Sequence, residues 1–353
     1  MSKLLNRYIF RVILGTSLLA LLVMLILDSL FSLLSELEDV GSGSYSLVDM
    51  MFYLTLTMPR RLVEITPVAL LVGGLLGMGT LASHSELVVM RASGKSRLEL
   101  VIAALQAGLV LSLAIALVSE FIAPTGERMA QTVRIEAGLQ DSSLSQGLWA
   151  RDGNLIIHIG AALPGPRLDR IEIYALDDNA ALSVLGQAAG ARFEDDRWIL
   201  EDAQFSLIKP DAIDQQIVPE VPWRSVLTPD TLEVLAVDPE DLALRELLTY
   251  IDYLSENGLN TGSYELAFWT KILAPLSNLA MLFVAMPFAF SPQRGTGTGY
   301  RLVIGIFIGL LFFLVNRLLG NLVLLYGYPP ALGAALPMLL LYLAGYWMLR
   351  RLR

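Results

Sequence analysis

Few residues in this sequence have the types and spacing that catalysis or ligand binding requires. The 353 residues contain no cysteine and two histidines, His84 and His158, which excludes thiol nucleophiles, iron–sulfur ligation and multi-histidine metal sites. Gly94-Lys-Ser resembles the end of a phosphate-binding loop, but Val89 stands where the pattern needs its first glycine. His84-Ser-Glu86 combines three catalytic residue types, yet neighbours in sequence do not face one another on a helix. We therefore expect no catalytic residue, bound cofactor or metal site in this chain.

Charged residues inside apolar stretches are the next candidates, because an ionisable group within a membrane span is a functional candidate by default. Asp28, Glu64, Lys271 and Arg317 are the four that qualify for a cavity, a gate or a lipid head group. Lys271 and Arg317 stand near the outer ends of their stretches, where long side chains reach the interface. Glu64 follows Arg60 by four residues, so a local ion pair explains it. Asp28 has no neighbour to pair with and is the least explained.

The loop around residues 84–94 predicts a short amphipathic helix. A serine cap, an acid near the start, apolar residues within and a glycine at the end are the usual signals for such a helix. The residues concerned are Ser85, Glu86, Leu87, Met90, Arg91 and Gly94. One interpretation is an interfacial helix that rests on lipid. The sharper one is a knob that docks a cytoplasmic protein, because the chain carries no motor of its own.

Membrane-spanning helices must position these candidates. Hydrophobic residues make up 55% of the chain and charged residues 17%, against about 25% in soluble domains, and the mean hydropathy is +0.59. A bilayer core of about 30 Å needs roughly 20 apolar residues as a helix. Six stretches qualify, three on each side of a more polar block: 12–34, 65–85, 100–119, 272–293, 302–325 and 331–349. The sequence therefore predicts an α-helical polytopic membrane protein.

The distribution of charge predicts how the chain is oriented. With six spans, the basic residues near both termini and around positions 91–97 and 294–301 fall on one face. The positive-inside rule assigns that face to the cytoplasm, so both termini are expected there. The formal net charge is −9, and the acidic excess is concentrated between Glu127 and Glu256. This acidic block is then expected outside.

The acidic block has the pattern of a β domain with a helical tail. Apolar or alternating runs at 155–159, 170–176 and 197–200 are separated by turn-forming clusters. Strands spaced this closely suggest a sandwich or a jellyroll. Asp238-Pro-Glu-Asp then predicts the start of a helix that runs to about Ser255. The expected division is three spans in 1–123, the all-β domain in 124–261 and three spans in 262–353.

Four segments carry a resemblance to a known family: Ser85–Gly94, Gln146-Gly-Leu-Trp-Ala-Arg-Asp-Gly-Asn, Leu227-Thr-Pro-Asp with Leu235-Ala-Val-Asp-Pro, and Tyr326-Gly-Tyr-Pro-Pro. Over nearly its whole length the chain resembles the LptF/LptG permease family of ABC transporters that export lipopolysaccharide. The resemblance implies six transmembrane helices in the inner membrane with a periplasmic β-jellyroll between the third and the fourth. That layout matches the one expected from the residues.

The resemblance also implies a function and partners. The chain is expected to be a permease subunit that extracts lipopolysaccharide from the inner membrane and passes it to a periplasmic bridge. It is expected to have no ATPase site of its own, and to work with the permease subunit LptF, with LptC, and with an LptB ATPase dimer that holds ATP and Mg. Two alternatives stay open: a membrane-anchored scaffold for periplasmic assembly partners and, ranked lower, a membrane hydrolase that uses Asp28 or Glu64.

The resemblance assigns roles to three regions. The family's loop helix inserts into a groove of the ATPase, and the acid that matches Glu86 is important for coupling. The family's first helix lines the gate, where lysines can stand at its outer end; here Glu36, Glu38 and Asp39 form an acidic rim instead. We favour a rim that faces water, and two alternatives stay open: divalent cations that bridge the carboxylates to lipid phosphates, or a basic surface on the partner subunit. The β domain is expected to offer inward-facing residues either as a slot for acyl chains or as a sealed core: Trp149, Leu155, Ile157, Ile171, Ile173 and Ile199.

Overall fold

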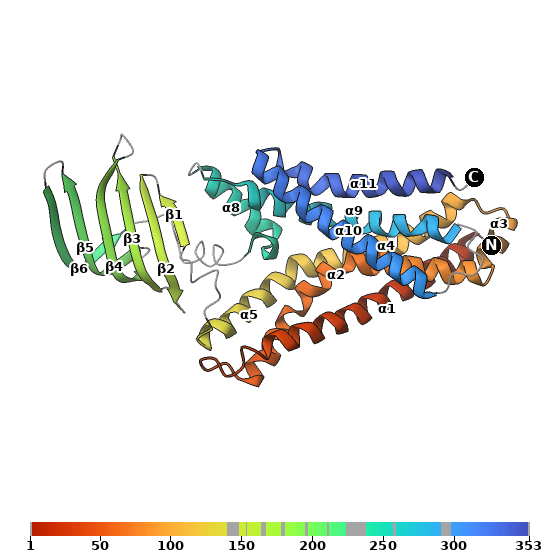
Figure 1. Ribbon diagram of the computed structural model, residues 1–353, viewed down its shortest axis with the longest axis horizontal. Helices are drawn as coiled ribbons and strands as arrows, with labels where there is room; N and C mark the ends of the chain where they lie inside the picture. Colours follow the sequence, from red (N-terminus) through yellow and green to blue (C-terminus); the bar gives the residue numbers. More distant parts are fainter. Residues whose placement is uncertain are drawn as a thin grey trace. The chain divides into compact units, whose positions relative to one another are not determined.

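The computed structural model describes residues 2–139, 148–152, 154–163, 167–177, 181–194, 197–209, 212–223, 238–256, 259–290 and 298–351. They divide into two compact units (Figure 1). The first unit contains Met1–Glu36, Leu54–Glu127 and Gly262–Arg353, and the second contains Leu37–Tyr53 and Arg128–Thr261. The Leu227 segment of the family resemblance lies outside the described residues.

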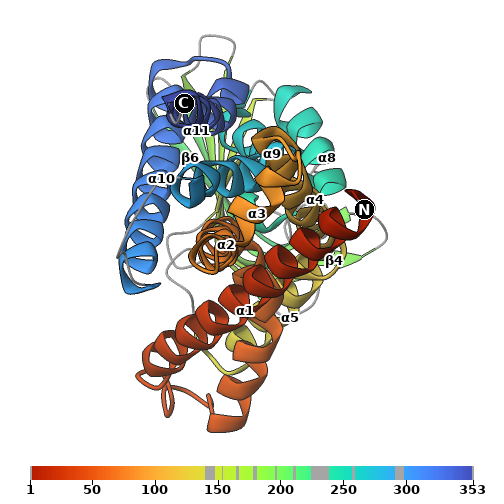
Figure 2. The ribbon, with the colours of Figure 1, turned by 90° about the vertical axis from the view of Figure 1, so that its right-hand side faces the viewer.

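The first unit is a bundle of long apolar helices. Six of the described helices are long and apolar enough to cross a membrane, which confirms the predicted number of spans. They are α1 (Ser2–Glu36), α2 (Leu47–Ser83), α4 (Arg97–Phe121), α9 (Gly262–Phe290), α10 (Thr298–Tyr326) and α11 (Pro330–Arg351). α2 is the most buried of them, with 67% of its most apolar window inside the unit, against 28% for α1 and 11% for α10. α2 is therefore the helix around which the bundle packs (Figure 2).

Small residues let α2 approach its neighbours closely. A Cβ on Gly73 would lie 2.4 Å from the Cα of Ser17 in α1, and a Cβ on Gly74 would lie 2.5 Å from Leu282 in α9. The Thr16 hydroxyl donates a hydrogen bond to the carbonyl oxygen of Gly73 over 2.8 Å. Membrane helices associate largely through such close packing, because apolar surface gains little by leaving lipid. The middle of α1 is therefore fixed to α2 by backbone contact.

The second unit contains one antiparallel sheet. Its six strands are hydrogen-bonded in sequence order. They are β1 (Leu148–Asp152), β2 (Leu155–Leu163), β3 (Arg167–Leu176), β4 (Leu182–Glu194), β5 (Arg197–Lys209) and β6 (Ala212–Trp223). A jellyroll needs two sheets, and the described strands form one meander, so that part of the predicted fold is not confirmed.

A line of kinks crosses the sheet and changes which residues face the core. Arg170 in β3 and Asp202 in β5 have left-handed backbone angles, φ 49° and 50°. Buried residues therefore stand three apart rather than two across each kink, as Leu200 and Ala203 do. The register is the same on both sides of the kink, so no residue is inserted. The strands bend while the same face of the sheet stays buried.

Helices flank the sheet in the chain of the second unit. α5 (Ala123–Glu136) occupies the start of the block expected to be β, and a 3₁₀ turn, η1 (Pro239–Asp241), precedes α8 (Leu244–Glu256). The helix predicted from Asp238 thus ends where expected but begins later, because Leu242 is extended and fully buried. Tyr253 of α8 packs against the buried face of the sheet. The remaining helix, α3 (Glu86–Ala92), belongs to the first unit.

Candidate functional site

The short helix α3 forms where the sequence predicts it, between α2 and α4. Gly94, with φ +92°, ends the helix, and the amide of Lys95 donates to the carbonyl of Met90 over 3.2 Å. This arrangement satisfies carbonyls at the helix end. The predicted serine cap is absent, because Ser85 adopts a left-handed conformation and its side chain makes no capping hydrogen bond. Glu86 is the first helical residue and Arg91 lies exposed in the last turn.

Two of the predicted docking residues are not accessible. Leu87 and Met90 are 4% and 5% exposed and belong to the apolar core of the helix bundle, so they hold α3 in place. Val88 and Val89 point the other way and are 66% and 68% exposed. Sequence reasoning missed this pair, although residues between two buried helical positions three apart are expected on the opposite face. The exposed side of α3 therefore presents two apolar side chains, Val88 and Val89, beside charged residues.

Glu86 has a partner on another helix. The hydroxyl of Tyr8, in the first turns of α1, donates a hydrogen bond to the Glu86 carboxylate. The two residues are 78 positions apart in sequence, so local spacing gave no sign of the contact. The start of α3 is thus joined to the start of α1 by side chains.

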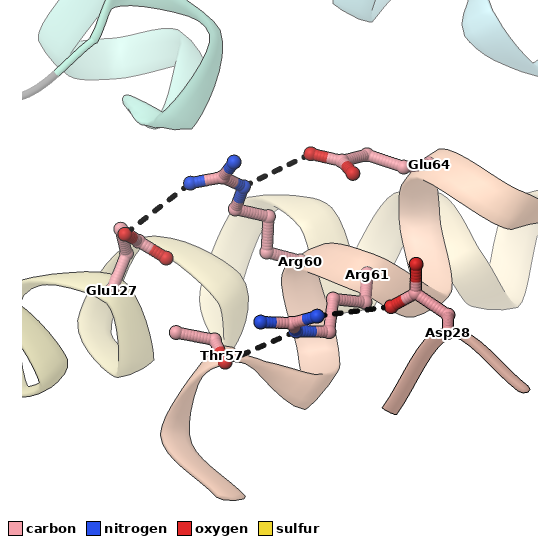
Figure 3. A network of polar contacts seen from close by, with 6 residues as sticks. All are labelled: Asp28, Thr57, Arg60, Arg61, Glu64 and Glu127. Carbon is pink, nitrogen blue, oxygen red and sulfur yellow. Dashed lines mark hydrogen bonds and ion pairs between the residues drawn. The ribbon is translucent and has the colours of Figure 1, made fainter. Parts of the chain in front are cut away.

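Two consecutive arginines of α2 organise the polar contacts that Figure 3 shows. Arg61 is 17% exposed at its side chain, and its Nη1 lies 3.0 Å from Oδ2 of Asp28 in α1. Its Nε donates to the Thr57 hydroxyl over 3.2 Å. The expectation that Asp28 has no neighbour to pair with is therefore wrong. Its partner stands 33 positions away, beyond the reach of reasoning from one helix.

Arg60 points to the other side of α2. Its Nε lies 2.9 Å from the Glu64 carboxylate, four residues later, which confirms the local pair expected for Glu64. Its Nη1 lies 3.3 Å from Glu127 at the start of α5, whose side chain is 4% exposed. A Cβ on the neighbouring Gly126 would lie 2.4 Å from the carbonyl oxygen of Leu56. At this level α2 and α5 are joined by both an ion pair and backbone contact (Figure 3).

The other two predicted intramembrane charges lie on helices that follow the sheet in the chain. Lys271 is half-buried in α9, and Arg317 is exposed on α10. Of the four candidates, Asp28 pairs with Arg61 and Glu64 pairs with Arg60, whereas Lys271 and Arg317 lie on α9 and α10.

The acidic rim does not simply face water. Glu36 is 8% exposed, whereas Glu38 is exposed. Within the second unit, Oδ2 of Asp39 lies 3.1 Å from the guanidinium of Arg134, which also stands over the ring of Tyr53. The expectation that the rim faces water is therefore wrong for Glu36, and for Asp39 it leaves out the ion pair with Arg134. Arg134 in α5 supplies the cation that the local sequence lacks.

The predicted acyl-slot residues divide between the two faces of the sheet. Ile157, Ile171 and Ile173 are at most 8% exposed, and Leu155 packs against them. Ile199 is half-buried on the other face, because its neighbours Trp198 and Leu200 take the buried positions. Trp149 is 58% exposed and pairs with His158 on the outer face. The inward orientation expected for Trp149 and Ile199 is therefore wrong.

Trp149 belongs to an aromatic and polar cluster on the outer face that the sequence did not suggest. Its ring lies 4.5 Å from that of His158 and 5.9 Å from that of Tyr174. The Tyr174 hydroxyl donates to Glu172 over 2.6 Å, and this hydrogen bond to a carboxylate raises the pKa of Tyr174. Aromatic pairs across strands stabilise a sheet. Such pairing holds the edge strand β1 on the sheet.

Comparison with known proteins agrees with this architecture. The sequence profile of the family described as "Lipopolysaccharide export system permease LptF/LptG" matches residues 7–351. The "Lipopolysaccharide export system permease protein LptG" of Escherichia coli K12 is 37% identical over 352 residues and 98% of both chains. The protein of the same name from Haemophilus influenzae is 33% identical over the full length of both chains. The chain therefore belongs to the LptF/LptG permease family and is a multi-pass membrane protein.

Proposed function

We propose that this member of the LptF/LptG family is a permease subunit that extracts lipopolysaccharide from the inner membrane and passes it to a periplasmic bridge. The proposal is carried by α3, a short helix held on the bundle core by Leu87 and Met90, with Val88 and Val89 exposed. A helix of this kind offers a separate protein a rigid apolar knob with charged residues beside it. Export is then driven by ATP that is hydrolysed on another chain.

The partners follow from this role. An LptB ATPase dimer, which holds the ATP and Mg, docks on α3. LptF completes a heterodimeric permease, and LptC is a further partner. The weakly buried helices α1 and α10 offer the apolar surface that a second permease subunit or lipid covers, since only 28% and 11% of their apolar windows are buried within this chain. No cofactor is assigned to this chain itself.

The orientation and the role of the sheet are parts of the same proposal. Both termini lie in the cytoplasm, because the basic residues of the termini and of the loop that carries α3 share one side of the six spans. The unit that contains the sheet then lies in the periplasm as a jellyroll-type domain. Its buried face, with Ile157 and Ile173, is the surface offered to acyl chains.

Reconstitution of the complete complex in proteoliposomes tests the proposal. Release of lipopolysaccharide should require ATP, and ATP turnover should depend on both the lipid and the surface of α3. The variant Val88→Ser with Val89→Ser should lose coupled release, whereas Ser83→Ala, at the exposed C-terminal end of α2, should keep it. A scaffold predicts ATP turnover that depends on neither the lipid nor α3, and that result would contradict the permease role.

A further inference from the structure

The Asp28 and Arg61 pair joins α1 to α2 at a particular depth. The uncharged part of α1 begins at Val12. A helix of about 20 residues from that point crosses the hydrocarbon core, so Asp28 lies about one turn inside its outer boundary. An ionised carboxylate at that depth needs a partner. Arg61 supplies one at 3.0 Å, and Thr57 steadies the guanidinium from the other side (Figure 3).

The contacts of α1 with α2 differ between its two halves. In the cytoplasmic half, Thr16 and Ser17 meet the backbone of Gly73, which has no side chain of its own. Asp28 is twelve residues further along, about 18 Å for a helix. The side chain of Asp28 is 41% exposed, so water or another charged group can compete for it. Backbone packing is lost only when the helices part, whereas a partly exposed ion pair exchanges its partners readily.

α2 is the fixed member of the pair. Arg60, next to Arg61, is tied to Glu127 of α5, and Gly126 brings the backbones of α5 and α2 together. α2 is also the most buried helix of the bundle, and α1 is buried over only 28% of its apolar window. Movement at this level therefore displaces α1 rather than α2.

We propose that Asp28 and Arg61 are positioning residues that form a releasable latch, which holds the outer half of α1 against α2 in the resting permease and opens in each transport cycle. The inference rests on the proposed export function, because the cycle is that of the ATP-driven complex. The latch acts through the position of α1. It needs no contact between either side chain and the transported lipid.

A cross-link across the latch tests whether it must open. The chain has no native cysteine, so Asp28→Cys with Arg61→Cys places two unique thiols there. In the complete complex, a short cleavable maleimide linker between them should lower ATP-dependent lipopolysaccharide release at least tenfold relative to the same variant without linker. Cleavage of the linker should restore release. Release that is unchanged by the linker would show a static ion pair and overturn the proposal.

The matched control is a cysteine pair where α2 and α5 touch. Leu56→Cys with Thr125→Cys flanks the close contact of Gly126, which is not expected to move. The same linker should change release there by less than twofold. A tenfold loss at this control pair would show that any cross-link stops the complex, and the latch assignment would then fail.

A measurement without lipid and ATP separates the latch from the export function. Spin labels at Leu22 on α1 and Met58 on α2, both exposed, report the distance between the helices. Asp28→Asn should broaden the distribution toward longer distances, and Asp28→Arg with Arg61→Asp should narrow it again. An unchanged distribution in Asp28→Asn would refute the latch even in a complex that exports lipid. A complex that exports no lipid before any substitution would refute the proposed function instead.

Discussion

Replacing Gly73 with alanine should loosen α1 from α2, although alanine is the better helix former. In a helix interior, alanine is more favourable than glycine by about 1 kcal/mol of free energy. Against this, the new Cβ would lie 2.4 Å from the Cα of Ser17. Carbon atoms pack at about 3.5 Å or more, so the two helices must separate by roughly 1 Å. Forcing extra atoms into packed positions costs about 1–3 kcal/mol. Two of the three nearest atoms, Cα and N of Ser17, are backbone and cannot rotate away.

The hydrogen bond from Thr16 adds little to this cost. Its hydroxyl lies 2.8 Å from the carbonyl oxygen of Gly73 and 2.9 Å from that of Val12 in its own helix. When the helices separate, the proton is donated to Val12 instead. Interhelical hydrogen bonds in membranes average about 0.6 kcal/mol, so the steric cost decides the sign. We expect Gly73→Ala to lower the free energy of unfolding by about 1–3 kcal/mol.

The glycines of this bundle provide their own controls for that measurement. A Cβ on Gly15 in α1 meets no atom within 4 Å, so Gly15→Ala should be neutral or stabilising. A Cβ on Gly74 meets the end of the flexible Leu282 side chain at 2.5 Å, so Gly74→Ala should fall between the two. Equilibrium unfolding in mixed detergent micelles measures the free energy of unfolding of each variant and so ranks the three. Equal stability of Gly73→Ala and Gly15→Ala would refute the close backbone contact between α1 and α2.

Three further results are expected. Glu86→Lys should uncouple ATP turnover from lipopolysaccharide release, since losing a charged contact at a desolvated interface costs about 2–5 kcal/mol; full release by this variant would contradict the role. Tyr8→Phe removes the hydrogen bond to Glu86 without changing charge, so turnover should persist while release per ATP falls; an unchanged ratio would show that the contact is incidental. Photo-crosslinkers at Ile157 and Ile173 should capture lipid only during ATP hydrolysis, whereas one at Trp149 on the outer face should not; silence at both isoleucines would indicate a sealed core.

The sequence predicted the elements of the bundle well because the bilayer imposes a simple rule. A span must be apolar over about 20 residues, and six stretches met that condition. Gly94 correctly predicted the end of α3, since few other residues adopt a left-handed backbone angle easily. An ion pair between residues of one helix can also be predicted from spacing, as Arg60 and Glu64 show.

The sequence alone could not predict contacts between distant segments of the chain. Spacing rules reach only three or four residues along one helix, so they give no partner for Asp28, whose partner Arg61 lies on another helix. The assignment of Ile199 failed for a different reason. Trp198, Ile199 and Leu200 are all apolar, so alternation gives no preference between the two faces. The kinks at Arg170 and Asp202 then change the parity within a strand, which a strict period of two does not anticipate.

The contacts of α1 together describe a lever. It meets the backbone of α2 at Thr16, its N-terminal arm ends in the hydrogen bond of Tyr8 to Glu86, and its C-terminal arm carries Asp28. At 1.5 Å per residue the arms measure about 12 Å and 18 Å. Because α1 is one uninterrupted helix, a shift of about 1 Å at Tyr8 becomes roughly 1.5 Å at Asp28, which takes a 3.0 Å ion pair beyond 4 Å. A displacement of α3 that moves Asp28 away from Arg61 would therefore open the proposed latch, provided that Thr16 stays against Gly73.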